Sequence, residues 1–115
     1  LSEDSTHCES SFEAMIRGLE VQAGTNTTIG AVVTNVKLPK AKLCKVAGMT
    51  HNGYARAICP VHTSADGDAI FTMAKGKVEA HIDVVGAVAA EVMMKAICRA
   101  VKVPSAYGFK GYLDL

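Results

Sequence analysis

The sequence predicts an α/β (α+β) protein with the order strand, helix, strand, helix. Residues 28–36 form a β-branched run that is typical of a buried strand, and residues 69–74 form a second, shorter run. Between and after these runs, apolar side chains recur at helical spacing. This alternation suggests a parallel α/β unit. Because two strands do not make a stable sheet by themselves, we expect the chain to complete a larger layered body, with helices outside and sheets inside.

The first part of the chain predicts one short helix and then a strand. Ser10 and Glu13 fit a capping box, and apolar residues follow at helical spacing, so we expect a helix from Ser11 to Val21. Gln22–Asn26 is then a linker. The strand Thr28–Val36 is apolar or small on both faces, which predicts a central strand covered on two sides.

A long helix is expected next. Pro39 suits the first turn of a helix, and an apolar stripe runs from Leu43 to Ile58. Gly48 and Gly53 each weaken a helix by about 1 kcal/mol relative to alanine. Their presence therefore indicates either close packing against a neighbour or a kink.

The second half of the chain predicts a short strand and the longest helix. Cys59–Asp68 is a connection that ends in a turn, Ala69–Ala74 is the second strand, and Lys75–Lys77 is a further turn. A helix is expected from His81 to Lys102, with a first half that is apolar on all sides and so predicted to be buried. Glu91 breaks the apolar stretch, which falls short of the ~20 residues that a membrane span needs.

Composition argues against several classes of partner. The chain carries 12 basic and 11 acidic side chains without a basic patch, which argues against nucleic acid and against membrane surfaces. The cysteines form no Cys-x-x-Cys pair and no zinc spacing, so we expect no metal and no other cofactor. Free cysteines in apolar helical patterns behave as small hydrophobes, which favours a reducing, cytoplasmic setting. Of the four cysteines, Cys44, Cys59 and Cys98 fall within such patterns, whereas Cys8 does not. The polar start, without a signal peptide or a methionine, suggests a fragment.

Two threonines stand where the polar linker meets the first predicted strand. If the Asn26–Thr27 bond were cut, Thr27 would carry both a hydroxyl nucleophile and a free α-amine. Such an amine titrates near about 7.7–8.0, so it can act as a general base at neutral pH without a histidine. The structural alternative is that Thr27 and Thr28 merely favour the β conformation.

Asp66 and Asp68, which flank a glycine, are the second candidate for chemistry. The structural alternative is a loop turn. Two carboxylates this close do not both ionise freely unless a cation lies between them, and an N-terminal ammonium or a metal would serve. His62 is near enough in sequence for a metal cluster, but no further ligands keep metal spacing, so a polar loop histidine is the preferred interpretation. His51 and His81 are interpreted as structural helix residues.

Four motifs in a fixed order are spread over residues 24–115, which make up most of the chain. They read Asn-Thr-Thr-Ile-Gly-Ala-Val-Val-Thr-Asn from residue 26, Met-Thr-His-Asn-Gly-Tyr-Ala-Arg-Ala-Ile from residue 49, Pro-Val-His-Thr-Ser-Ala-Asp-Gly-Asp from residue 60 and Ala-Tyr-Gly-Phe-Lys-Gly-Tyr-Leu-Asp from residue 106. With them the chain resembles the C-terminal part of the β-aminopeptidase and nylon-oligomer hydrolase family (DmpA, BapA and NylC relatives). Members of that family are N-terminal nucleophile hydrolases that cleave themselves into two subunits. Their αββα sandwich fits the layered body expected above.

The resemblance implies a role for each candidate residue. Thr27 would be the nucleophile, and its α-amine the base, after cleavage of the Asn26–Thr27 bond, with Thr28 in a secondary role. Asp66 and Asp68 match the family's acidic pair, at the same spacing from Thr27, and would orient and tune the amine. The family's oxyanion donors, an asparagine and a lysine, belong to the first subunit and match no position here.

The implied protein is a self-processing amide-bond hydrolase, that is, an aminopeptidase, an amidase or an ω-amino-acid oligomer hydrolase. Residues 1–26 would be the tail ahead of the cut, with a short helix, and residues 27–115 the nucleophile-bearing domain. Expected partners are a peptide or amino-amide substrate, the missing first-subunit segment, and further copies in a homo-oligomer. Two alternatives stay open: a non-catalytic, unprocessed relative that binds or assembles, and an acyltransferase like the ornithine acetyltransferases.

Overall fold

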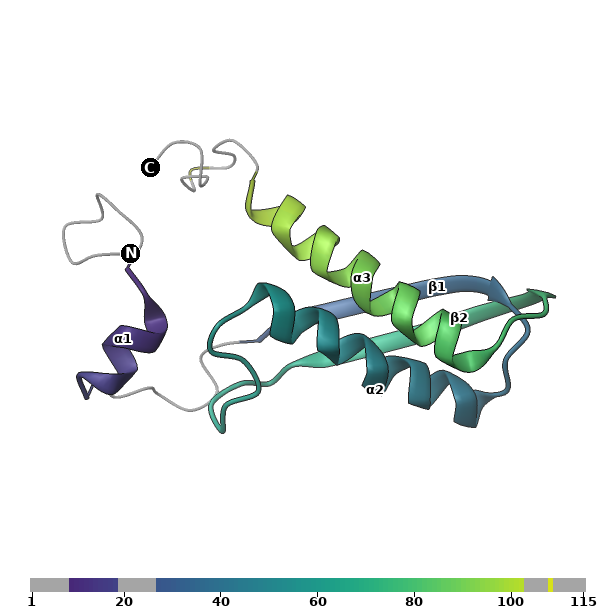
Figure 1. Cartoon of the computed structure of the whole chain (residues 1–115), viewed down its shortest axis with the longest axis horizontal. Helices are drawn as coiled ribbons and strands as arrows, with labels where there is room; N and C mark the ends of the chain where they lie inside the picture. The colour runs from purple at the N-terminus through teal and green to yellow at the C-terminus, as the bar shows by residue number, and fades with distance from the viewer. Residues whose placement is uncertain (1–8, 19–26, 103–107, 109–115) are drawn as a thin grey trace.

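A computed structural model describes residues 9–18, 27–102 and 108, and its elements follow the predicted α/β order (Figure 1). Helix α1 precedes strand β1, helix α2 connects β1 to strand β2, and helix α3 follows. Their bounds are Ser11–Ile16 for α1, Ile29–Val36 for β1, Lys40–Ala57 for α2, Ala69–Val78 for β2 and Ile82–Val101 for α3. None of these helices is long and apolar enough to cross a membrane. The proposed division of the chain at residues 26 and 27 stays a prediction, since Asn26 lies outside the described residues.

Local sequence accounts for the ends of the first and last helices. The Ser10 hydroxyl accepts a hydrogen bond from the Glu13 amide at the start of α1, as the capping box predicted. The helix nevertheless ends at Ile16, short of the predicted Val21. Gly18 adopts a φ of 90° just beyond this end, which is a common way to terminate a helix. At the start of α3, His81 Nδ1 accepts from the Asp83 amide.

The two strands form a parallel sheet in which Ile29 pairs with Ala69, and the register is regular as far as Thr34. Beyond that point the prediction of a turn at residues 75–77 was wrong, because β2 continues to Val78. Residues 75–77 lie opposite Asn35 alone, so they form a bulge instead of a turn. Gly76 takes a φ of 71° within this bulge.

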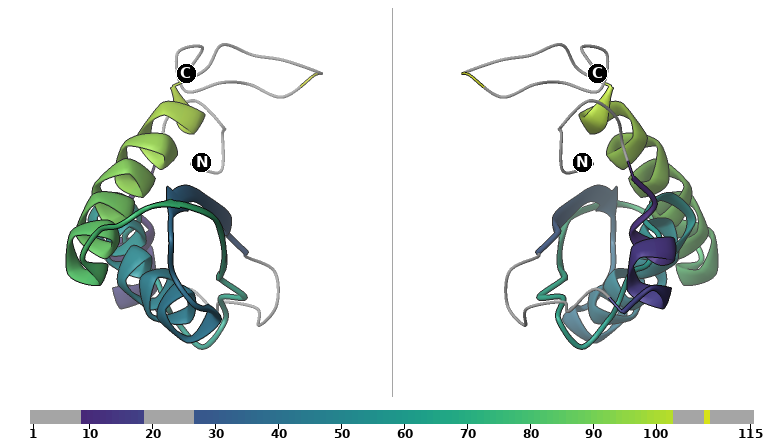
Figure 2. Two further views of the ribbon diagram at one scale, coloured as in Figure 1. Left: turned by 90° about the vertical axis from the view of Figure 1, so that its right-hand side faces the viewer. Right: turned by 90° about the vertical axis from the view of Figure 1, so that its left-hand side faces the viewer.

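Helices α2 and α3 pack against each other and lie on the same side of the sheet (Figure 2). The core lies between these two helices and the sheet. Its buried side chains include Val36, Val46, Thr50, Tyr54, Ala89, Ala90 and Met93. The Thr72 hydroxyl donates to the Leu43 carbonyl at 3.0 Å and so fastens β2 to α2. Gly53 is buried where α2 touches α3, whereas Gly48 is exposed with nothing near it. Close packing therefore explains one of the two helix glycines, and no contact explains the other.

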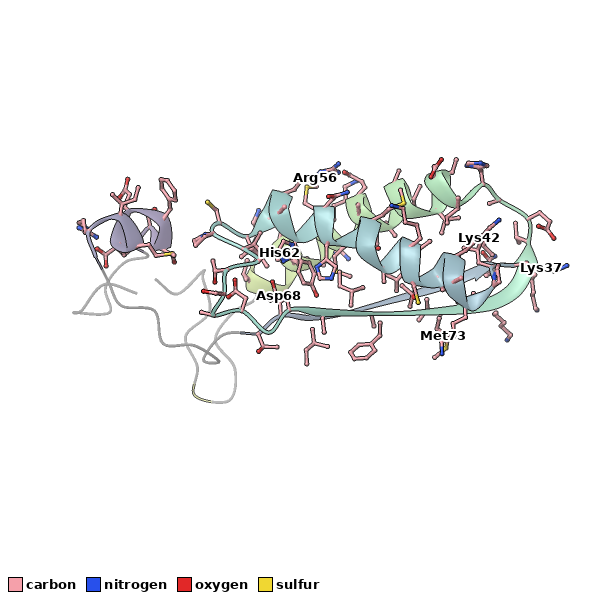
Figure 3. All side chains as sticks on the ribbon, turned by 90° about the horizontal axis from the view of Figure 1, so that it is seen from below. Lys37, Lys42, Arg56, His62, Asp68 and Met73 are labelled. Atoms are coloured by element: carbon pink, nitrogen blue, oxygen red, sulfur yellow. The ribbon has the colours of Figure 1, made fainter. Side chains whose placement is uncertain are left out.

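The opposite face of the sheet is apolar and open among the described residues. Ile29, Val33, Phe71 and Met73 are 65% to 75% exposed there, and Figure 3 shows Met73 pointing away from the helices. The prediction of a strand covered on two sides is therefore not met within the part of the chain that the structure describes.

Burial of the first half of α3 was also predicted too broadly. Gly86 and Ala90 are buried where α3 meets α2, and Ala89 is buried as well, but Val84 and Val88 are more than half exposed. The cysteines differ from expectation in the same way, since Cys44, Cys59 and Cys98 are exposed. Each helix buries only the side that meets its neighbour, and Cys59 lies beyond the end of α2.

Candidate active site

The candidate residues meet at the end of the sheet where both strands begin. Parallel pairing places Thr28, just before β1, beside Ala69 at the start of β2, and the Ala69 amide donates to the Thr28 carbonyl at 3.0 Å. A pocket of about 320 Å³ opens at this end. It is lined by Ser11, Thr27, Thr28, Ile58, Val61, Asp66 and Asp68. The structure therefore brings both threonines and both acids to one hollow, with Thr27 exposed to solvent.

Asp68 is the better buried of the two acids, with its side chain only 7% exposed. Its Oδ1 accepts a hydrogen bond of 3.0 Å from the amide nitrogen of Thr28. Its Oδ2 is buried without a hydrogen-bond partner among the described residues and lies 3.4 Å from His62 Nδ1. Figure 3 shows His62 and Asp68 side by side at this end of α2. The Asp68 carboxylate is thus hydrogen-bonded to the backbone of Thr28, the residue that follows Thr27.

The side chain of Asp66 accepts hydrogen bonds from within its own loop. Its Oδ2 accepts from the amide of Thr63 at 2.8 Å and from the Thr63 hydroxyl at 2.9 Å. These bonds make the loop turn that was the structural alternative for this residue. Because Asp66 also lines the pocket, the turn holds its carboxyl group at the rim of the hollow.

Tyr54 is fully buried and lies near enough to Asp68 to be affected by its charge. Its hydroxyl is 3.4 Å from the Thr28 carbonyl and 3.3 Å from the Ala69 carbonyl, at the first pair of the sheet. Burial raises the pKa of Tyr54, and the nearby negative charge of Asp68 raises it further. Gly30 makes room for this ring, since a Cβ there would lie 2.6 Å from the Tyr54 hydroxyl.

The rings of His51 and His62 lie next to the Tyr54 ring. The His62 ring is stacked on the Tyr54 ring at 6.3 Å and 19°, and the His51 ring meets His62 edge-on at 4.9 Å. His51 Nδ1 is buried and has no hydrogen-bond partner in the described structure. Sequence reasoning treated His51 and His62 as separate structural residues and Tyr54 as part of an apolar stripe. All three residues fall within the motifs that begin at residues 49 and 60, but the resemblance assigned them no role. In the structure their rings contact one another, and His62 lies beside Asp68.

The acids and histidines do not gather into a metal-binding group. Across residues 9–18 and 27–102, no three His, Cys, Asp or Glu side chains are placed to hold a metal ion. The site instead contains hydroxyl groups, carboxylates and a backbone amide. Such a set is suited to proton transfer and nucleophilic chemistry.

Comparison with known proteins places the chain in a family. The model for peptidase family S58 matches residues 3–111, so the chain belongs to this family. It is 36% identical to 6-aminohexanoate-oligomer endohydrolase from Kocuria sp. (strain KY2) over 94 residues, which is 70% of this chain and 26% of that protein. The enzyme of the same name from Paenarthrobacter ureafaciens is 34% identical over 90 residues, or 67% of this chain and 25% of that protein.

A second group of relatives consists of aminopeptidases. An uncharacterized aminopeptidase from Mycobacterium leprae (strain TN) is 49% identical over 55 residues, covering 48% of this chain and 15% of that protein. The chain therefore spans about a quarter of the length of the oligomer hydrolases, and less of the aminopeptidase. Membership of the family expected from the four motifs is confirmed.

Proposed function

We propose that this chain carries the nucleophile half of a self-processing amide-bond hydrolase, with Thr27 as the nucleophile. The supporting observation is that Thr27 is exposed on a polar pocket shared with Asp66 and Asp68, while Asp68 holds the next backbone amide. A threonine that merely favoured a strand would not require two acids around it. Family membership supports the same conclusion.

The first step we propose is cleavage of the chain itself. The Thr27 hydroxyl oxygen attacks the carbonyl carbon of Asn26, and the bond from that carbon to the Thr27 nitrogen breaks. This shift leaves an ester between Asn26 and the Thr27 oxygen, and the nitrogen takes up the hydroxyl proton. Water then hydrolyses the ester, releasing Asn26 as a carboxylate and Thr27 with a free hydroxyl and a free α-amine.

In the second step the freed Thr27 acts on substrate. Its α-amine takes the hydroxyl proton as the oxygen attacks the substrate carbonyl, and that proton then passes to the leaving amine. Water hydrolyses the resulting acyl ester and regenerates the hydroxyl. Asp66 and Asp68 orient the ammonium form of the amine in this scheme. The relatives named as 6-aminohexanoate-oligomer hydrolases and aminopeptidases favour a substrate with a free amine: a peptide, an amino-amide or an ω-amino-acid oligomer.

Two apolar surfaces are open among the residues that the structure describes. One is the open face of the sheet, and the other is a groove of about 370 Å³ between α3 and β1, lined mainly by valines and alanines. Apolar surface of this extent is normally covered by protein. We propose that the rest of a longer polypeptide covers it and supplies the oxyanion donors, that the complete protein is a homo-oligomer, and that it works in the cytoplasm.

The test compares Thr27→Val with Thr27→Ser in the full-length protein. Valine keeps the shape of threonine without the hydroxyl, so we expect no fragment beginning at residue 27 and no hydrolysis of 6-aminohexanoate oligomers. Serine keeps the hydroxyl and should retain both reactions. Intact-mass measurement and product analysis report the two results. A Thr27→Val protein that still cuts itself or turns over substrate would refute the assignment, and an uncut, inactive wild type would support a binding role.

A further inference from the structure

The buried carboxylate of Asp68 is only half satisfied. Oδ1 accepts from the Thr28 amide, but Oδ2 has no hydrogen-bond partner in the described parts of the chain although its side chain is only 7% exposed. A buried charged oxygen without a donor is unfavourable, so such an atom normally has a function or a partner close by. The Tyr54 hydroxyl is not that partner, because it is directed to two backbone carbonyls.

His62 is the side chain within reach. Its Nδ1 is 3.4 Å from Asp68 Oδ2, slightly longer than the roughly 2.7–3.2 Å of a usual hydrogen bond. The His62 ring lies over the Tyr54 ring and meets the edge of His51, and these contacts limit its orientation. The backbone of His62 has a φ of 58°, a left-handed conformation that is uncommon outside glycine but that histidine, like asparagine and aspartate, adopts more often than most residues. A small rotation of this ring brings Nδ1–H into bonding distance of the carboxylate.

We infer that His62 is a positioning residue for the proposed hydrolysis, in which its Nδ1–H holds Asp68 Oδ2 while Oδ1 holds the Thr28 amide. The inference rests on the proposed function for its catalytic meaning. Thr28 is joined to Thr27 by one peptide unit, so a rotation of Asp68 displaces the nucleophile directly. The side chain of His62 is 40% exposed, and it acts in this scheme through Asp68.

The kinetic test uses His62→Ala and His62→Asn in the full-length protein. Asparagine places an amide N–H near the position of Nδ1 and tolerates the left-handed backbone, so it preserves the donor. For His62→Ala we expect self-cleavage and kcat to fall about tenfold to a hundredfold, as misplacement of reacting groups does, with KM within about twofold. His62→Asn should recover most of this loss. Equal rates for wild type and His62→Ala, or equal losses in both variants, would overturn the inference.

A second measurement does not depend on activity. Hydrogen–deuterium exchange at the Thr28 amide, measured in the Thr27→Val background so that no chain can cut itself, reports whether Asp68 still holds that amide. We expect faster exchange with His62→Ala, and wild-type protection with His62→Asn or with His81→Ala, a histidine at the start of α3. Unchanged exchange in His62→Ala contradicts the inference even if the wild type is active. Faster exchange in a protein whose wild type is inactive overturns the proposed function and leaves His62 a structural residue only.

Discussion

Replacement of Gly53 by alanine tests how α2 is held over the sheet. Gly53 lies in the second half of α2, directly before Tyr54, and is buried against α3. A Cβ at this position would overlap the backbone carbonyl oxygen of Ala90 and would lie 2.9 Å from the Cβ of Met93. Backbone atoms of a packed helix cannot rotate away, so α2 and α3 would have to separate.

The expected magnitude comes from two opposing effects. Gly→Ala inside a helix stabilises by about 1 kcal/mol because alanine has the better helix propensity. Overpacking in a filled core costs about 1–3 kcal/mol. Gly48 is in the same helix, but it is exposed and has nothing within 4 Å of an added Cβ. Gly48→Ala should therefore show only the gain, and Gly53→Ala should be about 1–3 kcal/mol less stable than Gly48→Ala.

Urea unfolding of the two variants beside the wild type measures this difference. The midpoint should rise for Gly48→Ala and fall, or stay near the wild type, for Gly53→Ala. Because Tyr54 follows Gly53 and reaches the Thr28 carbonyl, a shifted α2 should also slow the cleavage proposed at Thr27. A Gly53→Ala protein as stable as Gly48→Ala would show that α2 and α3 are not in the close contact described here.

Two further predictions concern the charge at the site and the open face of the sheet. Asp68→Asn should lower the pKa of Tyr54, because a neighbouring negative charge disfavours tyrosinate, yet leave it above the ordinary value since burial is the larger cause. Ultraviolet titration against a Tyr54→Phe control measures this, and Asp66→Asn should leave that pKa unchanged. Phe71→Ser should destabilise the full-length protein by more than about 2 kcal/mol in urea unfolding. The Phe71 ring is 65% exposed in this chain, and we propose that the rest of the full-length protein covers it. A change in stability near zero would contradict this proposal.

The order of elements was predictable because its signals are local. The β-branched run before Val36 and the helical spacing after Pro39 are properties of neighbouring residues, and the structure has a strand and a helix there. Burial was less predictable, because it depends on what each side faces. Val84 and Gly86 both lie in the apolar half of α3, but only the side carrying Gly86 meets α2, where an added Cβ would overlap Met49.

The candidate site was likewise predictable only in part. Thr27, Asp66 and Asp68 were linked in the sequence only by the resemblance to the family, and the structure lines one pocket with them. Tyr54 and His62 lie within two of the family motifs, but the resemblance assigned them no role. Tyr54 reaches Thr28 only because Gly30 leaves the space for its ring.

His62 reaches Asp68 only because the loop places its ring on Tyr54. The Tyr54–Thr28 contact joins residues 26 positions apart and depends on how α2 packs on the sheet. His62 and Asp68 lie in the same connection between α2 and β2, and the path of that loop sets their contact. If Thr27 is the nucleophile, Thr27, Asp66 and Asp68 supply the reacting groups, and these two contacts decide whether the backbone holds them in place. Variants at Tyr54 and His62 therefore test two contacts to which the resemblance assigned no role.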